Sequence, residues 1–392
     1  MFHPPVLLAC LAAALAEPPV AGGLDPGDPG VPTPRDEPSR ADDEPIINGE
    51  AAEEADWPMA GGVILDAFLR SPWGDYAFRS LLCSSTLIAP DVVLLAAHCV
   101  DETAITYGKG SLEDEDYRWS RRADLSAFTG MEVADWPADA VSSWDRVFHD
   151  EWDLFAMGEG VGRSYDVGLL FLDTAVLDVP FAYLPLASEA SQIATGVAVE
   201  VVGWGQQTPQ IEPPPGTVGY KRMGTSEIGE LGTYEMQVGP DREDVRKCHG
   251  DSGGPTFLEV ATDSLETWRI VGVTSHAYDA TQCRRTGGVD TRVDAYLEWI
   301  DREMRERCEA GTRAWCDEAG IPALPYPPPE DTGDSASGPG DGEEEGGCGC
   351  GVPVSRARPP GALLALGMLV LARRRGDRFR PNPRPFRSGR PR

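Results

Sequence analysis

Residues 247–255 read KCHGDSGGP, a segment in which one serine stands among glycines and an aspartate. A serine hydroxyl attacks a carbonyl carbon only when a base lies within hydrogen-bond reach and donors stabilise the oxyanion that forms. Glycine permits the tight turns that bring backbone N–H groups close to the attacked carbonyl. We therefore take Ser252 as a candidate nucleophile, and the amides of Gly250 and Ser252 as candidate donors of an oxyanion hole.

The candidate base is His98, which follows the apolar run SSTLIAPDVVLLAA and precedes Cys99. His149 lies in an acidic, tryptophan-rich segment, and we expect it at the surface. The candidate orienting acid is Asp166 in SYDVGLLFLD, directly ahead of a segment typical of a buried strand. An isolated aspartate at a strand start is usually a turn residue, but Asp166 gains weight because it stands between His98 and Ser252 in the chain.

The chain has 392 residues, enough for one large domain or two medium ones with an ample core. Its formal charge is −30 and is unevenly distributed, because residues 373–392 contain nine arginines and one aspartate. An acidic main body repels phosphate, which argues against nucleic acid as a partner. We expect no cofactor.

The N-terminus is typical of a secretory signal peptide (residues 1–16), with an apolar run that ends near Ala16. An alternative is a lipoprotein signal that uses Cys10. Export predicts a secreted or cell-surface protein in an oxidising compartment, where cysteines pair. Residues 17–45 are rich in Pro, Asp, Glu and Gly and predict a disordered pro-segment or linker.

From residue 46 onward, short apolar runs such as GGVIL, VVLLAA, VGLLFL and WRIVGVTS are broken by Gly, Pro and Asp. Such runs predict the strands of an all-β sandwich or barrel. Near the end of this body, the segment DTRVDAYLEWIDREMRERC predicts a helix, because its apolar residues recur at helical spacing. These residues are Val293, Tyr296, Leu297, Ile300 and Met304.

Beyond this body, residues 317–346 form a linker rich in proline, glycine and acidic residues. Residues 347–376 contain GCGCG, a short apolar stretch and an arginine cluster, and residues 377–392 are a further basic tail. The apolar stretch is well short of the ~20 residues that a spanning helix needs. The segment 347–376 resembles the C-terminal sorting signals of myxobacterial exported proteins, which implies membrane contact only through this tail. The alternative is a marginal membrane segment or a tail without a role.

The pieces IINGE, LCSSTLIAPDVVLLAAHCV, DVGLLFL, VEVVGWG, CHGDSGGP, IVGVTS, GVDTRV and YLEWI follow one another along the chain. In this order they resemble serine proteases of the trypsin and chymotrypsin family, and the resemblance covers Ile46 to about Arg307. It implies an all-β fold of two packed antiparallel six-stranded β-barrels (chymotrypsin-like) with a C-terminal α-helix, in a protease domain of residues 46–316. It also implies that His98 is the general base and acid, that Asp166 holds its tautomer and that Ser252 attacks the peptide bond.

The resemblance implies two disulfides that flank the catalytic histidine and serine, Cys83 with Cys99 and Cys248 with Cys283. It does not pair Cys308 with Cys316, but these two cysteines stand eight residues apart and close a short loop easily. A disulfide typically contributes about 2–4 kcal/mol to stability.

The resemblance further implies activation by proteolysis, in which a new N-terminus at Ile46 folds inward and pairs with Asp251. Pro45 precedes Ile46, where a trypsin-like activator would need Arg or Lys, and the nearest basic residue is Arg40. We therefore expect an activating protease of different selectivity, or trimming after a cut at Arg40. The alternative is that Ile46 stays internal and only packs.

The substrate pocket is assigned to Arg246, Lys247, Ser275 and Asp290. Trypsin-like relatives carry an acid at the position of Arg246, so we expect no preference for Lys or Arg substrates. Three arrangements remain open at this point. Arg246 pairs with Asp290 and leaves a neutral pocket, or a basic residue faces the cleft and selects Glu or Asp, or the basic residues point outward from an apolar pocket.

An insert between Gly108 and Gly162 carries the acidic run EDED. A calcium loop is one reading of such a run, but an acidic run is more often a solvated surface, and we predict no metal site. The sequence as a whole predicts a secreted or surface-tethered serine endopeptidase that cleaves proteins or peptides. The alternative is a catalytically silent relative that serves as a binding or adhesion module. The chain order His, Asp, Ser argues against a lipase or esterase, whose serine precedes the acid and the histidine in the chain.

Overall fold

The computed structural model describes residues 46–130, 133–208, 216–262, 265–279 and 282–322. The predicted signal peptide, the pro-segment, most of the linker and both tail segments lie outside these residues. Among the residues that are described, no helix is both long and apolar enough to cross a membrane.

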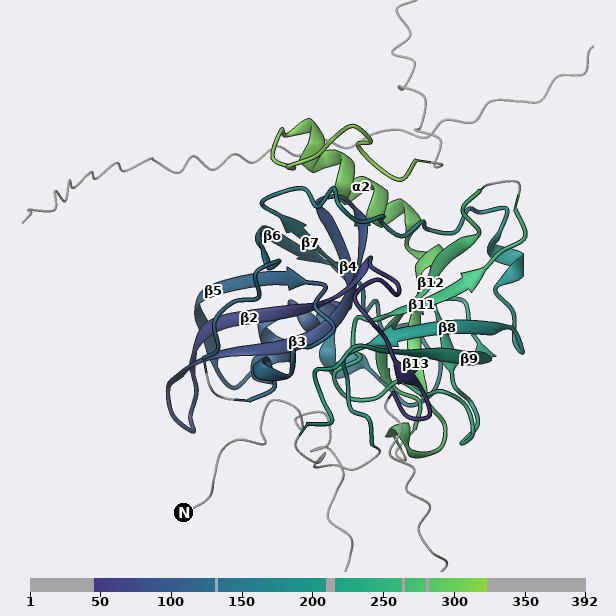
Figure 1. The fold of residues 1–392 in the computed structure, drawn as a ribbon, viewed down its shortest axis with the longest axis horizontal. Helices are drawn as coiled ribbons and strands as arrows, with labels where there is room; N and C mark the ends of the chain where they lie inside the picture. The colour runs from purple at the N-terminus through teal and green to yellow at the C-terminus, as the bar shows by residue number, and fades with distance from the viewer. Residues whose placement is uncertain (1–45, 131–132, 209–215, 263–264, 280–281, 323–392) are drawn as a thin grey trace, which may run out of the picture. The chain divides into compact units, whose positions relative to one another are not determined.

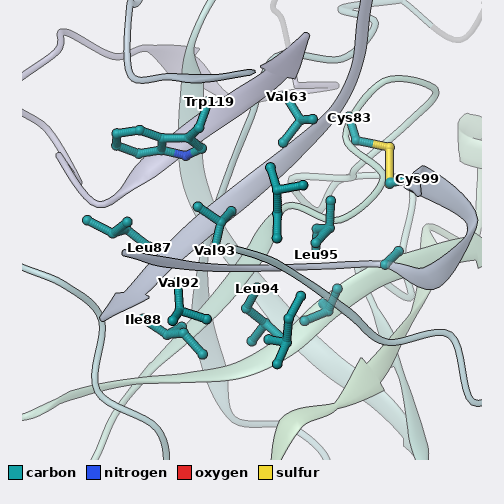
Figure 2. Packing of buried hydrophobic residues seen from close by; sticks show 14 of the residues in the cluster. Val63, Cys83, Leu87, Ile88, Val92, Val93, Leu94, Leu95, Cys99 and Trp119 are labelled. Carbon is teal, nitrogen blue, oxygen red and sulfur yellow. A yellow bond between two sulfur atoms is a disulfide. The ribbon is translucent and has the colours of Figure 1, made fainter. Parts of the chain in front are cut away.

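The first barrel closes six antiparallel strands in the order β2-β3-β4-β7-β6-β5. These strands are β2 (Ala60–Arg70), β3 (Tyr76–Ala89), β4 (Val92–Leu95), β5 (Ser111–Ser120), β6 (Val141–Phe148) and β7 (Gly168–Leu172). Strand β4 has the sequence VVLL and is buried at every position, with β3 and β7 paired on its two sides. Side chains such as Val63, Leu87, Val93 and Trp119 belong to the surrounding hydrophobic core (Figure 2).

The second barrel closes six antiparallel strands in the order β8-β9-β10-β13-β12-β11, and the short β1 adds to β9 at one side. The strands are β1 (Glu50–Ala51), β8 (Ala198–Gly203), β9 (Arg222–Leu231), β10 (Glu235–Val238), β11 (Pro255–Glu259), β12 (Trp268–Ala277) and β13 (Gly288–Arg292). Strands β3 and β4 of the first barrel contact β11 and β12 of the second. Figure 1 shows the two barrels side by side, which confirms the predicted fold class.

The predicted C-terminal helix is α2 (Leu297–Glu309). The five apolar residues that predict it from the sequence are all buried. The helix begins later than the periodicity suggests, because Val293 lies in a preceding 3-10 turn and Tyr296 caps the helix. The other helices are α1 (Glu102–Thr106), η2 (Ala97–Cys99), η3 (Ser126–Phe128), η4 (Leu154–Ala156), η5 (Ala190–Gln192), η6 (Gln282–Arg284) and η7 (Val293–Ala295).

All three predicted disulfides are present in the structure. They are Cys83–Cys99, Cys248–Cys283 and Cys308–Cys316. The first joins β3 to η2, and the second joins the segment before Ser252 to η6. Two of the three therefore restrain the two parts of the chain that carry the candidate base and the candidate nucleophile.

A buried ion pair fixes the segment that follows α2. The Arg313 guanidinium donates to the Asp91 carboxylate at 2.6 Å, and neither side chain is exposed to solvent. The Trp315 amide donates to the same carboxylate, and Arg313 also donates to the carbonyl of Ala319. Asp91 lies between β3 and β4, so this segment, residues 310–322, is locked onto the first barrel.

Replacing Arg313 with leucine should lower the free energy of unfolding by about 3–5 kcal/mol, because it leaves the Asp91 carboxylate buried without its cation. The matched control is Arg302→Leu, which removes a half-exposed arginine of α2 and should change stability by less than about 0.5 kcal/mol. Urea unfolding of both variants measures the difference. A loss below about 1 kcal/mol for Arg313→Leu would contradict the assignment of this ion pair as the anchor.

Candidate active site

Strand pairing in the first barrel brings His98 and Asp166 together. His98 lies in η2, three residues after the end of β4, and Asp166 stands two residues before the start of β7. Strands β4 and β7 are antiparallel neighbours in which Leu95 lies opposite Gly168. The end of one strand therefore meets the beginning of the other, and the two side chains meet at the same edge of the barrel.

The Asp166 carboxylate holds His98 with two hydrogen bonds. His98 Nδ1 lies 2.8 Å from Asp166 Oδ2, and the His98 amide donates to Oδ1 at 3.0 Å. The Asp166 side chain is fully buried, whereas the imidazole is 20% exposed. The imidazole is therefore fixed through Nδ1 and through its own backbone.

Each group of this pair changes the pKa of the other. Burial alone disfavours both charged forms, but the charge of Asp166 and its hydrogen bond outweigh burial and raise the pKa of His98. The charge of His98 and the hydrogen bonds to the carboxylate likewise outweigh burial and lower the pKa of Asp166. The carboxylate therefore stays ionised, and it stabilises the imidazolium that forms when His98 accepts a proton.

The second barrel also holds Asp166. The Ser275 hydroxyl, on β12, donates to Asp166 Oδ2 at 2.6 Å, and the Thr291 hydroxyl, on β13, donates to the Asp166 carbonyl at 2.9 Å. The sequence assigns Ser275 to the substrate pocket, and the structure instead directs its hydroxyl to this carboxylate. Thr291 was missed, although it follows directly after Asp290 in the GVDTRV motif.

Ser252 lies in a turn shaped by two glycines with positive φ, Gly250 at 94° and Gly253 at 75°. The Gly253 amide donates to the carbonyl of Thr274, and the Ser84 hydroxyl donates to the carbonyl of Gly250. In the part of the chain that is described, the amides of Gly250 and Ser252 donate to no acceptor. Two N–H groups are thus available on this turn, as an oxyanion hole requires.

Asp251 is fully buried and accepts hydrogen bonds from the amides of Gly205 and Cys248, both at 2.8 Å. Glycine is required at position 205, because a Cβ there would overlap the Asp251 carboxylate. Within the described residues, no side-chain cation lies at ion-pair distance from this carboxylate. Burial raises the pKa of Asp251 to about 6.

Ile46 is fully buried and packs among residues of the second barrel, including Val199 and Val201. Its backbone φ is +33°, in a region that is strained for a β-branched residue. The predicted partner of a free Ile46 amine, Asp251, is buried in the same barrel. The activation pair itself stays a prediction.

The four residues assigned to the substrate pocket are all buried, at 6% exposure or less. Lys247, and not Arg246, pairs with Asp290, at 2.6 Å, and it also donates to the Thr256 hydroxyl. The Arg246 guanidinium donates to the Cys283 carbonyl at 2.7 Å and has no carboxylate partner among the described residues. The first arrangement, in which Arg246 pairs with Asp290, is therefore wrong, because the neighbouring Lys247 is the cation that neutralises Asp290.

Three of the four acidic residues in the run EDED pair with arginines. Glu113 pairs with Arg70, Glu115 with Arg146 and Asp116 with Arg118. Among the described residues, the one group with the spacing of a metal site is Cys83, His98 and Cys99, and its two sulfurs form a disulfide. His149 was expected at the surface, but it packs against Tyr165, Tyr296 and Trp299.

Comparison with known proteins agrees with this geometry. The family model described as Trypsin matches residues 46–300. The chain belongs to the trypsin family. It is 28% identical to "Trypsin" of Saccharopolyspora erythraea over 66% of this chain and 98% of the relative. It is 27% identical to "Chymotrypsin-C" of Bos taurus over 66% of this chain and 89% of the relative.

A third family member that it resembles is "Melanization protease 1" of Drosophila melanogaster, at 29% identity over 57% of this chain. This match spans 58% of that protein's length. At these identities the family and the general class of serine protease are shared. The identity of the reacting groups and of the substrate must be argued from the site itself.

The uncut chain should lose stability as the pH rises through about 6, because the buried Asp251 carboxyl binds its proton more tightly in the folded than in the unfolded state. The contribution of this raised pKa to the free energy of unfolding is present in full below about pH 4 and is lost above about pH 6, a difference of about 3 kcal/mol. Urea unfolding of uncut Ser252→Ala protein at both ends of this range measures it. Asp251→Asn in the same background should remove the step, and an equal step in both proteins would contradict the assignment.

Proposed function

We propose that the protein is a serine endopeptidase in which His98, Asp166 and Ser252 act as the catalytic triad. The observation that carries the proposal is the buried hydrogen bond from His98 Nδ1 to Asp166 Oδ2, at 2.8 Å. That bond leaves His98 Nε2 as the ring nitrogen available to a nucleophile. A binding module has no need of an ionised carboxylate behind a histidine, beside a serine turn with two free amides.

In the proposed reaction, Ser252 Oγ attacks the carbonyl carbon of the peptide bond while His98 Nε2 takes its proton. The amides of Gly250 and Ser252 stabilise the resulting oxyanion, and loss of one such donor costs about 3–4 kcal/mol of barrier. His98 then gives the proton to the leaving amine, and an acyl-enzyme forms on Ser252. Water, deprotonated by His98, attacks the ester and releases the acid product and the free serine.

We also propose that the protein is made as a zymogen. Cleavage after Pro45 would free the Ile46 backbone from the strained φ of +33° and place an ammonium group near the buried Asp251 carboxylate. Such a pair is favourable because each ion offsets the burial of the other. Pro45 excludes an activator that requires Arg or Lys there, so the activating protease has a different selectivity or a trimming step follows.

For the location of the protein, we propose export and either secretion or retention at the cell surface through the C-terminal tail. The proposal rests on the sequence of residues 1–16 and 347–376 and on the disulfides, which are typical of oxidising compartments. The proposed substrates are proteins or peptides outside the cell.

A protein of residues 46–322 with a free Ile46 amine should react with a serine-directed fluorophosphonate, and mass spectrometry should locate the adduct on Ser252. Ser252→Ala should abolish labelling and peptide hydrolysis, and its free energy of unfolding should stay within about 1 kcal/mol of that of the parent. Asp251→Asn should greatly reduce labelling. Hydrolysis that survives in Ser252→Ala would overturn the triad, and a folded parent that does not label would favour a silent binding module.

We further propose that the enzyme does not select Lys or Arg on the acyl side of the scissile bond. The region that would receive this side chain contains two cations and one carboxylate, and Lys247 already neutralises that carboxylate. A substrate cation would approach Arg246, whose guanidinium has no carboxylate at ion-pair distance among the described residues. Like charges placed in a desolvated site repel each other by several kcal/mol.

A library of fluorogenic peptides that vary only at this position should show kcat/KM values for Lys and Arg at least about 100-fold below those of the preferred residue. Changing Arg246 to aspartate should raise the relative rate for Lys and Arg, because it replaces the unpaired cation with an anion. A preference of the parent enzyme for Lys or Arg would contradict the proposed pocket.

A further inference from the structure

Glu235 is a buried carboxylate that the proposed mechanism does not use. It opens strand β10 of the second barrel and is 1% exposed. Its oxygens accept three short hydrogen bonds, from the Ser164 amide at 2.7 Å, the Ser164 hydroxyl at 2.5 Å and the Gly162 amide at 2.6 Å. No cation pairs with it in the described part of the chain. All three donors belong to the part of the first barrel that leads into Asp166.

The residues just before Asp166, which we call the 160–166 segment, are bonded to the second barrel at every second position. The Gly160 amide donates to the Tyr278 carbonyl at 2.7 Å. Gly162 and Ser164 donate to Glu235, and Asp166 accepts from two hydroxyl groups of the second barrel. Between these anchors, the Arg163 guanidinium lies over the ring of Tyr234, the residue before Glu235, at 4.1 Å.

Glu235 and Thr291 lie directly opposite each other on the paired strands β10 and β13. Residues paired in this way have neighbouring side chains on one face of the sheet. Thr291 reaches the Asp166 carbonyl, and Glu235 reaches the backbone two and four residues earlier. A single cross-strand pair thus holds both ends of the 162–166 stretch.

The cost of burying the Glu235 carboxylate without hydrogen bonds fixes the position of the 160–166 segment. A carboxylate buried without a cation is tolerated only if hydrogen bonds satisfy its oxygens, and loss of those bonds costs several kcal/mol. Here one stretch of chain supplies all three donors. If the 160–166 segment moved away, the Glu235 charge would stay buried and unsatisfied. The segment, with Asp166 at its end, is therefore restricted to one position relative to the second barrel.

We propose that Glu235 is a positioning residue for catalysis, which acts by holding Asp166 at the distance and angle that His98 requires. This inference rests on the proposed peptidase function. Ser275 and Thr291 contact Asp166 itself, whereas Glu235 acts through Ser164 and Gly162. Because a displacement of about 1 Å in a catalytic group can cost about 100-fold in rate, the effect should appear in kcat and not in KM.

Activity measurements on the free-Ile46 enzyme test the proposal. Glu235→Ala should lower kcat about 10- to 100-fold with KM nearly unchanged. Glu235→Gln should fall between this variant and the parent, because its amide oxygen still accepts from Ser164 while its NH₂ group opposes the Gly162 N–H. Ser164→Ala removes one hydroxyl donor, provides a variant that folds if Glu235→Ala does not, and should lower kcat by a smaller factor.

The matched control is Glu189→Gln, which alters another buried carboxylate, one that lies between β7 and β8 and is bonded to the second barrel. Glu189 pairs with Arg269 near the start of β12, six residues before Ser275, or about 20 Å along the strand. Glu189→Gln should lower the free energy of unfolding at least as much as Glu235→Ala does. It should keep its kcat within about twofold of the parent, since Glu189 touches no part of the 160–166 segment. A kcat for Glu235→Ala within twofold of the parent, or equal losses of kcat in Glu189→Gln and Glu235→Ala, would overturn the proposal.

A second measurement does not depend on hydrolysis. In the Ser252→Ala background, NMR should show a strongly downfield proton between His98 Nδ1 and Asp166, and a raised imidazole pKa. Glu235→Ala should weaken or remove that signal and return the pKa of His98 towards about 6.5. An unchanged signal and pKa would overturn the positioning role. If the parent fails to hydrolyse peptides while these NMR changes occur, the proposed function fails and the positioning role stands.

Discussion

The charge of Asp166 is the constraint on which the site depends. Its carboxylate has no access to water, so it can remain ionised only where donors surround it on every side. The first barrel supplies two of these donors, both from His98, and the second supplies the Ser275 hydroxyl. The geometry of a base bonded to its orienting acid therefore exists only when the two barrels are correctly assembled.

Other buried carboxylates of the described chain show how differently the same problem is solved. Asp290 and Asp91 have cations, in Lys247 and Arg313, and these pairs can persist as long as both partners remain. Asp251 accepts from two backbone amides and has no cation at ion-pair distance among the described residues, and burial raises its pKa further than these hydrogen bonds and the charge of Lys247 lower it. A carboxylate left in this state favours any event that brings a positive charge to it, which is the physical basis of the proposed activation.

The sequence predicts the strands that carry continuous apolar runs, among them β2, β4, β7, β8 and β12, because a strand buried on both faces is apolar at successive positions. It also predicts α2, because a helix buried on one side repeats its apolar residues at helical spacing. It does not reveal β5, because its EDED run has the composition of a solvated surface, whereas in the fold three of these four acids pair with Arg118 of β5 itself, Arg70 of β2 and Arg146 of β6. Short motifs identify His98, Asp166 and Ser252 as candidates, since the chemistry requires those residue types.

Contacts that depend on side-chain direction are harder to predict. Arg246 and Lys247 are adjacent, so their side chains leave an extended backbone on opposite sides, and only the strand register decides which one faces Asp290. The same holds for Ser275, which a shift of one residue would turn away from Asp166. Glu235 follows Tyr234 in a short polar segment with no motif, and its three donors lie some 70 residues away in the chain. Only the packing of the barrels shows this contact.

The family match ends at residue 300, whereas the ion pair between Asp91 and Arg313 extends the folded unit to the residues beyond α2. A force applied to the chain beyond Pro322 would therefore be divided between α2 and the first barrel. It would reach α2 through the Ile321 amide, which donates to Asp301, and through the disulfide from Cys316 to Cys308. It would reach the first barrel through the ion pair of Arg313 with Asp91, so the helix and the strand that ends at His98 would bear such a pull together.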